Sequence, residues 1–228
     1  MPLGHKPHSP TLIEGLPAAI ADIIWAAATT ERYTTGQIIH YRGDKKPGLS
    51  IVKSGSVDVG TLGRDGRILS IGTLGVGESF GEFTLFADLP RTHDISALEP
   101  SIIAQIPASK MHALCDAEPL ILKALLRVAL IRSHAAFERL DDDKRLSLAV
   151  RTAKRLLGLT GRESQTKTLS MTQSDIAHMM GVSRVSIGKA LEALTRGGFI
   201  TRGYGVITIN DPTAMQDWVA RHSVTHNL

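Results

Sequence analysis

The segment from Met171 to Ile200, MTQSDIAHMMGVSRVSIGKALEALTRGGFI, constrains the fold more than any other part of the sequence. Its apolar residues fall on one face of a first helix and one face of a second, and Gly181 lies between them, where a left-handed turn is easiest for glycine. Ser183 can cap the second helix by accepting a hydrogen bond from its free N–H groups. The apolar positions are Ile176, Ala177, Met179 and Met180 in the first helix and Ile187, Ala190, Leu191 and Leu194 in the second. This is the layout of a helix-turn-helix, whose second helix enters the DNA major groove, and an ordinary helical hairpin is the alternative.

The composition excludes several classes of protein. The chain has 228 residues, of which 43% are hydrophobic, enough for one large core or two modest cores. No apolar run approaches the roughly 18 residues of a membrane span, and Met1–Pro10 lacks the apolar core of a secretory signal. Cys115 is the only cysteine, which excludes an internal disulfide. These features predict a cytoplasmic protein without a membrane partner.

Charge is distributed unevenly along the chain. Residues 144–228 contain 12 Lys and Arg against 5 Asp and Glu, whereas residues 1–143 contain 14 against 17. A basic C-terminal part beside a mildly acidic N-terminal part indicates that only the former meets a polyanion, although a solvated basic surface would show the same counts.

Short β-type runs alternate with glycine turns from Tyr33 to Pro107. The runs are QIIHY, LSIVKSG, SVDVGTL, RILSIGTL, DISAL and SIIAQI, and Asp65-Gly66 is a strong hairpin signal between two of them. Many short strands with frequent glycine turns predict a small barrel, roll or sandwich, with a loop-rich α/β domain as the alternative. A short helix is expected before them, from Leu16 to Thr29, with Pro17 in its first turn.

A long helix from Glu118 to about Leu140 carries two apolar faces. Ile121, Leu125 and Val128 form one of them. The other repeats at heptad-like spacing and consists of Leu122, Leu126, Ala129, Ser133, Ala136 and Leu140. Because a helix with two apolar faces needs two partners, we expect the β domain to cover one face and a second copy of the helix to cover the other. The result would be a parallel homodimer, with burial inside a monomer as the alternative. Asp141-Asp142-Asp143 predicts a polar break and a hinge.

The remaining elements complete the C-terminal part. A helix is expected from Leu146 to Leu159, Phe199–Arg202 and Gly205–Ile209 have the pattern of a small hairpin or wing, and Asp211–Arg221 predicts a last short helix. The predicted domains are a flexible arm over residues 1–15, a β domain over 16–117, the long helix and hinge over 118–143, and the C-terminal domain over 144–228.

Two segments in a fixed order resemble the Crp/Fnr family of regulators. One is GESFGEFTLFADLPRT, Gly77 to Thr92, which resembles the phosphate-binding cassette of cyclic-nucleotide domains: F-G-E, a short helical turn, then R-S or R-T. The other is the helix-turn-helix, and the apolar long helix lies between them. The resemblance covers roughly Leu16 to Ile209. It implies an α+β fold with an N-terminal β-roll, a long dimerisation helix and a C-terminal winged helix-turn-helix. It also implies double-stranded DNA and RNA polymerase as partners.

The cassette implies a cyclic nucleotide as ligand, either cyclic AMP or cyclic GMP. Gly81 lets the backbone approach a ligand closely. In the family the residue matching Glu82 accepts a hydrogen bond from the ribose 2′-hydroxyl, and the one matching Arg91 pairs with the cyclic phosphate, with a small hydroxyl such as Thr92 beside it. An internal ion pair between Glu82 and Arg91, in a regulator that needs no ligand, is the alternative.

The base-contacting positions depart from the family's pattern. An ungapped count from Pro119 places Ala136 and Phe137 where cyclic-AMP-binding members carry a Thr-Ser pair that hydrogen-bonds the adenine. Neither side chain offers a polar partner, although Phe137 can stack on a base. We therefore expect weak discrimination between purines, and another nucleotide or none stays open. No metal, haem or iron–sulfur cluster is expected, because Cys115 cannot hold a cluster alone and lone histidines are mostly structural.

The recognition helix departs from the family at two DNA-reading positions. Arg184 matches an arginine of the family's recognition helix and can bind guanine O6 and N7. Val185 replaces a glutamate and can touch a thymine methyl group instead, while Lys189 replaces a second arginine. The full set predicted to contact a palindromic operator is Thr172, Gln173, Ser183, Arg184, Val185, Ser186 and Lys189. Thr172 and Gln173 are expected at phosphates, with simple helix capping as the alternative for Thr172.

The sequence therefore predicts a homodimeric, sequence-specific DNA-binding regulator controlled by a cyclic nucleotide or another small effector. A cyclic-nucleotide-binding regulatory subunit that acts on a protein partner is the alternative that the cassette alone would permit. The helix-turn-helix and the basic C-terminal part disfavour it. No enzyme is expected, because the sequence holds no nucleophile–base or metal-ligand cluster at a recognisable spacing.

Overall fold

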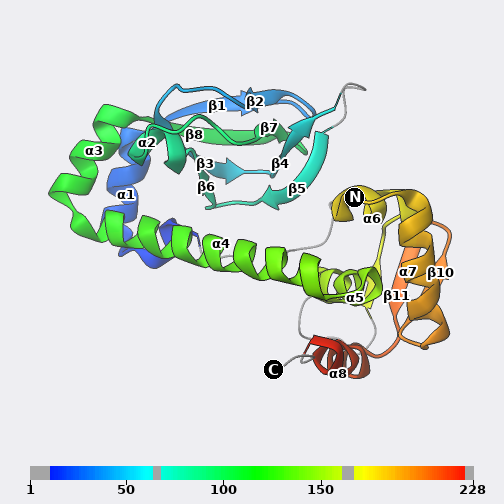
Figure 1. The fold of residues 1–228 in the computed structure, drawn as a ribbon. Coiled ribbons are helices and arrows are strands. Elements are labelled where there is room, and N and C mark those ends of the chain that lie inside the picture. The colour runs from blue at the N-terminus through cyan, green and yellow to red at the C-terminus, as the bar shows by residue number, and fades with distance from the viewer. Residues whose placement is uncertain (1–10, 64–67, 161–166, 224–228) are drawn as a thin grey trace. The chain divides into compact units, whose positions relative to one another are not determined.

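The structure is a computed structural model that describes residues 11–63, 68–160 and 167–223. The chain forms two compact units, one of residues Pro10–Ser133 and one that includes His134–Leu228. Figure 1 shows strands gathered in the first unit and mainly helices in the second. The boundary between them falls inside the longest helix, α4 (Pro119–Arg145).

Two four-stranded antiparallel sheets build the first unit, which confirms the predicted β-roll. Their strand orders are β1-β8-β3-β6 and β2-β7-β4-β5. The strands are β1 (Thr29–Tyr33), β2 (Ile38–His40), β3 (Gly48–Ser54), β4 (Val57–Leu62), β5 (Ile68–Leu74), β6 (Ser79–Phe80), β7 (Asp94–Ala97) and β8 (Ser101–Pro107). All six predicted runs form strands, whereas β1 and β6 were missed. The Asp65-Gly66 turn lies outside the described residues, but β4 and β5 on either side of it pair antiparallel.

Four helical segments pack on the sheets of the first unit. They are η1 (Ile13–Gly15), α1 (Ala18–Ala27), α2 (Glu82–Phe86) and α3 (Ala108–Ala117). Pro17 occupies the N-cap of α1, as its fixed φ favours, and Ile24 of α1 is fully buried. The predicted boundary of the N-terminal arm is wrong for its last residues, because Leu12 is fully buried in the same core as Ile24 and Ile121.

Helix α4 exposes one of its two apolar faces and buries the other. Ile121, Leu125 and Val128 are 0%, 4% and 3% exposed, and the first two pack in the core that includes β3, β8 and α3. On the other face, Leu126 is 56% exposed and Leu140 is 58% exposed. The prediction that the β domain covers one face is confirmed. The heptad-spaced face has no cover within the described chain.

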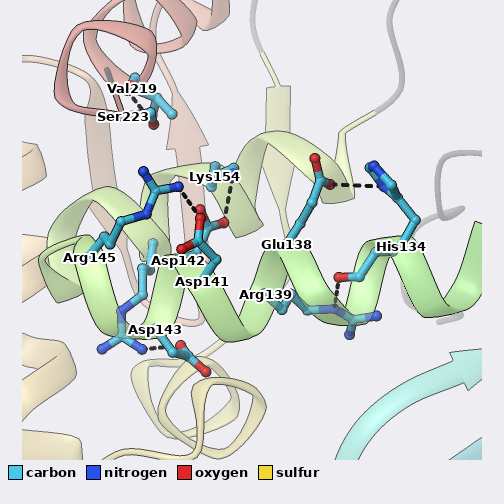
Figure 2. A network of polar contacts seen from close by, with 12 residues as sticks. His134, Glu138, Arg139, Asp141, Asp142, Asp143, Arg145, Lys154, Val219 and Ser223 are labelled. Carbon is cyan, nitrogen blue, oxygen red and sulfur yellow. Dashed lines mark hydrogen bonds and ion pairs between the residues drawn. The ribbon is translucent and has the colours of Figure 1, made fainter. Parts of the chain in front are cut away.

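The three consecutive aspartates do not break the helix, contrary to the prediction. Helix α4 continues through them to Arg145, because each carboxylate has a cation within reach. Asp141 pairs with Arg145 one turn later, Asp142 pairs with Lys154, and Asp143 pairs with Arg151 (Figure 2). Lys154 and Arg151 belong to α5 (Leu148–Leu159), so two ion pairs tie the end of α4 to the next helix.

The second unit is a winged helix-turn-helix, as predicted. Its elements after α5 are β9 (Lys167–Leu169), α6 (Gln173–Met180), α7 (Arg184–Arg196), β10 (Ile200–Gly203), β11 (Val206–Ile209) and α8 (Pro212–Ser223). The three strands form a small antiparallel sheet in the order β10-β11-β9. One core joins all of these helices, and its fully buried members include Leu156, Ile176, Ile187, Leu194 and Met215. Strand β9 had no counterpart in the sequence-based prediction.

None of the helices in the described ranges combines the length and apolar character needed to cross a bilayer.

Candidate nucleotide site and DNA-reading surface

Gly81 allows β6 and α2 of the cassette to lie close against β3. Its φ angle is 109°, in the region that side-chain-bearing residues rarely adopt. A Cβ atom at this position would lie 2.4 Å from the carbonyl oxygen of Gly48 and 3.1 Å from Nη1 of Arg91. Only glycine fits at this position, and its lack of a side chain lets the backbone of the cassette lie beside the Arg91 guanidinium.

Arg91 is a buried cation with little internal compensation. Its side chain is 8% exposed, and its one hydrogen bond among the described residues is a long one of 3.5 Å from Nη2 to the carbonyl oxygen of Lys46. Its Nε atom is buried without a partner in the same part of the chain. Burial lowers the pKa of the guanidinium, and the charges of Asp44 and Glu82 partly oppose that shift. Because an unpaired buried charge is costly, the group fits an anionic ligand such as a cyclic phosphate.

Glu82 is held by a residue that the sequence analysis missed. Its Oε1 atom accepts a 2.6 Å hydrogen bond from Ser79 Oγ and lies 3.5 Å from Nη1 of Arg132. Arg132 also donates to the carbonyl oxygen of Ser79 at 2.8 Å and lies 3.8 Å from Glu78. No ion pair joins Glu82 to Arg91 in the described part of the chain, so the internal pairing considered from the sequence is not formed.

The spacing of the buried residues along α4 could have indicated that Arg132 lies on the same face. Ile121, Leu125 and Val128 lie on the buried face, and a further step of four residues reaches Arg132. A cation that continues a buried apolar face needs an acidic partner, and Glu82 and Glu78 are that partner.

Thr92 and Arg91 line a cavity beside the cassette. Its volume is about 480 Å³, and its lining residues are Arg42, Gly43, Pro90, Arg91, Thr92 and His93. Gly81 and Glu82 are not among them, so this cavity contains only two of the predicted ligand residues. The Thr92 hydroxyl is exposed and lies 2.9 Å from Nδ1 of His93, whose pKa is lowered by burial and by the charge of Arg42.

A neutral histidine lies near the same guanidinium. Burial and the charge of Arg91 lower the pKa of His40 to about 4. Its Nε2 atom is 3.1 Å from Ser50 Oγ, which donates in turn to Gln105, and its ring lies edge-on to Phe80. Near neutral pH, His40 is therefore uncharged and Arg91 carries the only positive charge of these two side chains.

The structure brings only some of the predicted ligand residues together. Gly81, Glu82 and Arg91 lie within one unit and close to one another, as the distances above show. Ala136 and Phe137 belong to the second unit, where both are exposed and Phe137 is 70% exposed. Their contact with a base stays a prediction.

The helix-turn-helix has the Gly181 turn and the Ser183 cap that the sequence predicted, and Thr172 caps α6, which was the alternative considered for it. The Thr172 hydroxyl accepts a hydrogen bond from the N–H of Asp175 at 3.1 Å, and the Asp175 carboxylate accepts from the N–H of Thr172 at 2.8 Å. Gly181 closes the first helix with a φ angle of 64°. Ser183 caps α7 by accepting from the N–H of Ser186 at 3.1 Å.

Helix α7 presents the predicted reading residues to solvent. Ser183, Arg184, Val185, Ser186 and Lys189 lie away from the core, and Val185 is 70% exposed, while Ile187 and Leu191 on the opposite face are buried. The contact of Val185 with a base edge stays a prediction.

Gln173 uses its amide group inside the protein. Nε2 donates to the carbonyl oxygen of Arg184 at 2.7 Å, and Oε1 accepts from Nη2 of Arg202 at 3.1 Å. The phosphate contact predicted for Gln173 stays a prediction. Arg202 on β10 is exposed and was not among the predicted residues.

Both regions match known domains. Residues 30–118 match the model of the cyclic nucleotide-binding domain, and residues 150–218 match that of the Crp-like helix-turn-helix domain. A chain with these two domains in this order is a transcription regulator with a DNA-binding domain. It belongs to the Crp/Fnr family.

Three relatives and solved structures match between 84% and 86% of the chain. The CRP-like cAMP-activated global transcriptional regulator of Mycobacterium tuberculosis is 27% identical over 201 residues, which cover 86% of this chain and 89% of the relative. A Crp/Fnr regulator of Thermus thermophilus has the same fold, with a TM-score of 0.68, 24% identity and coverage of 84% and 98% of the two chains. The c-di-GMP responsive global regulator of Xanthomonas campestris gives a TM-score of 0.65 at 22% identity, covering 85% and 99%.

Proposed function

We propose that this protein is a homodimeric, sequence-specific DNA-binding regulator whose β-roll binds a cyclic nucleotide. The observation that carries the nucleotide site is the Arg91 guanidinium, which is buried, lacks a carboxylate partner among the described residues and lies beside the glycine turn and Glu82. A buried cation of this kind is stabilised when an anion takes the place of lost water.

The proposed ligand contacts divide into a phosphate part and a base part. Arg91 and Thr92 bind the cyclic phosphate. Glu82 accepts a hydrogen bond from the ribose hydroxyl, and Arg132 holds the Glu82 carboxylate in place. Ala136 and Phe137 contact the base by apolar packing alone, so cyclic AMP and cyclic GMP should bind with similar affinity. The Mycobacterium relative is named as cAMP-activated and the Xanthomonas protein as c-di-GMP responsive, and so both kinds of nucleotide belong in the test.

The proposed dimer uses the heptad-spaced face of α4. The leucines on or next to this face, Leu122, Leu126, Leu130 and Leu140, are between 47% and 60% exposed. Large apolar side chains in one row along a helix are typical of a coiled-coil seam. A two-fold dimer would present two recognition helices to a palindromic operator, with half-site centres about 34–36 Å apart.

On the DNA, Arg184 and Lys189 are proposed to read base edges and Val185 a thymine methyl group. Ser183 and Ser186 would lie at the same edge, and Thr172 would approach the phosphates. As a regulator bound at operators, the protein would act in the cytoplasm with RNA polymerase as its partner.

Titration calorimetry with cyclic AMP, cyclic GMP and cyclic di-GMP, followed by operator binding with and without each, tests the proposal. Binding of one nucleotide together with a change in DNA affinity is the expected result. If none binds at millimolar concentration and DNA binding is unchanged, the chain is a regulator without a nucleotide effector.

A further inference from the structure

Gln173 joins three separate elements of the DNA-binding unit. It is the first residue of α6, its amide nitrogen donates to the carbonyl oxygen of Arg184 at the start of α7, and its amide oxygen accepts from Arg202 on β10. The two distances are 2.7 and 3.1 Å, both within ordinary hydrogen-bonding range. One side chain thus connects the first helix, the recognition helix and the wing.

Gly188 provides the space in which this amide lies. A Cβ atom at that position would be 2.7 Å from Nε2 of Gln173 and 3.6 Å from its carboxamide carbon. Gly188 lies inside α7, one turn after Arg184, where glycine otherwise costs helix stability. Its lack of a side chain therefore serves the close approach of the Gln173 amide to the recognition helix.

Arg202 is a cation that contacts Gln173 and has no acid to neutralise it among the described residues. It lies on β10 opposite Ile207 of β11, and its side chain is exposed. Its contact to Gln173 Oε1 is its one hydrogen bond in this part of the chain, and no ion pair involves it there. One of five guanidinium N–H groups is used, which leaves the others for an outside acceptor.

We propose that Gln173 is a positioning residue that orients wing Arg202 toward a DNA phosphate beside the base pairs that Arg184 reads. The inference rests on the proposed DNA binding and replaces a direct phosphate contact by Gln173 with an indirect one. The Gln173 amide keeps one uncharged N–H donor beyond its bond to Arg184, whereas the guanidinium that it holds has both charge and several free donors.

The test is the salt dependence of DNA binding by the full chain, measured by fluorescence anisotropy on an operator selected from random DNA. Arg202→Ala should reduce the slope of log affinity against log salt by about one, since one phosphate contact is lost. Between about 50 and 200 mM salt its affinity should then fall about threefold less than that of the wild type.

Gln173→Ala removes no charge and should nevertheless reduce the slope toward that of Arg202→Ala, because the guanidinium is no longer oriented. The double variant Gln173→Ala/Arg202→Ala should bind no more weakly than Arg202→Ala alone. Gly188→Ala retains both side chains and displaces only the amide, so it should resemble Gln173→Ala. Arg221→Ala on α8 removes an equal charge from the same unit and serves as the matched control, with a slope close to the wild type.

Additive losses from Gln173→Ala and Arg202→Ala, or an unchanged slope for Arg202→Ala, would overturn the inference and favour a direct contact by Gln173. Circular dichroism of each variant separates loss of folding from loss of contact. Failure of the proposed DNA binding would be distinguishable from failure of this inference, because the wild type itself would then select no operator.

Discussion

The guanidinium of Arg132 lies 3.5 Å from the Oε1 atom of Glu82, so helix α4 directly holds the carboxylate proposed to bind the ribose. The same helix exposes the leucines proposed to form the dimer. Helix α4 therefore contacts the cassette through this side chain as well as packing on the sheet through Ile121 and Leu125.

Loss of this contact should weaken nucleotide binding without abolishing it. Arg132→Ala leaves Glu82 with only the Ser79 hydroxyl as a partner among the described residues, and the affinity should fall by about 1 kcal/mol, roughly fivefold, in calorimetry. Lys123→Ala removes an exposed cation from the same helix and is the control. Equal affinities for the two variants would show that Arg132 has no part in the site.

Replacement of Arg91 should have opposite effects on binding and on stability. Arg91→Leu removes the partner of the phosphate and should cost about 2–5 kcal/mol of nucleotide affinity. Because the guanidinium is buried with almost no internal partner in the described chain, the free energy of unfolding without ligand should not fall, and can rise. Urea unfolding with and without nucleotide measures both. A variant that unfolds far more easily without ligand would mean that Arg91 is structural.

The heptad-spaced face should control the oligomeric state. Leu126→Glu would place charge against charge in the proposed seam, at a cost of several kcal/mol. Analytical ultracentrifugation should show a dimer for the wild type and a monomer for the variant, which should also lose operator binding. Lys123→Glu, also exposed on α4 but outside the seam, should remain dimeric. A wild type that is monomeric at micromolar concentration contradicts the proposal.

Stability should decrease in acid because of His40. Its pKa in the folded protein is about 4, below the ordinary value of 6.5, so the unfolded chain takes up the proton first as the pH falls. The free energy of unfolding should therefore decrease between about pH 6.5 and pH 4 and lose nothing further from this group below that window. His40→Gln should reduce this decrease in urea unfolding. His93 remains in both proteins and contributes in the same direction.

The recognition helix should set operator sequence through two adjacent residues. Arg184→Ala should cost about 1–3 kcal/mol and relax the preference at one base pair, because a bidentate guanine contact is lost. Val185→Glu should shift the neighbouring preference toward a pair that contains cytosine, whose amine a carboxylate accepts. Selection from random DNA reads out both. Unchanged sequence logos would mean that α7 does not read these base pairs.

Regular patterns in the sequence predicted most of the fold, and long-range pairing accounts for what was missed. Strands with alternating or continuous apolar runs and long helices with apolar stripes were found. Strand β6 has two residues and β9 three, too short for any period, and both exist because β3 and β11 pair with them. The aspartates of α4 were expected to end it, since their cations on α5 are eight and twelve residues away.

In the candidate site too, residues of a local motif were predicted and residues that meet through long-range contacts were not. Gly81, Glu82 and Arg91 belong to one local motif, and the sequence named them. Arg132 is separated from Glu82 by 50 residues and Arg202 from Gln173 by 29, so neither contact leaves a local pattern. The periodicity of the buried face of α4 could have placed a cation at position 132 on that face, but Arg132 was not predicted.

The ion pairs between α4 and α5 determine at which residue an isolated DNA-binding fragment should begin. Residues 134–143 contribute four acids and one base to the DNA-binding unit, and two of those acids pair with Arg151 and Lys154. A fragment that begins at Lys144 would keep Arg151 and Lys154, but it would lose all four of these acids and Arg139. The affinity of this fragment for any polyanion would rise, whereas its preference for one DNA sequence over another would not change. We therefore expect the acidic end of α4 to lower the affinity of the DNA-binding unit for polyanions of any sequence.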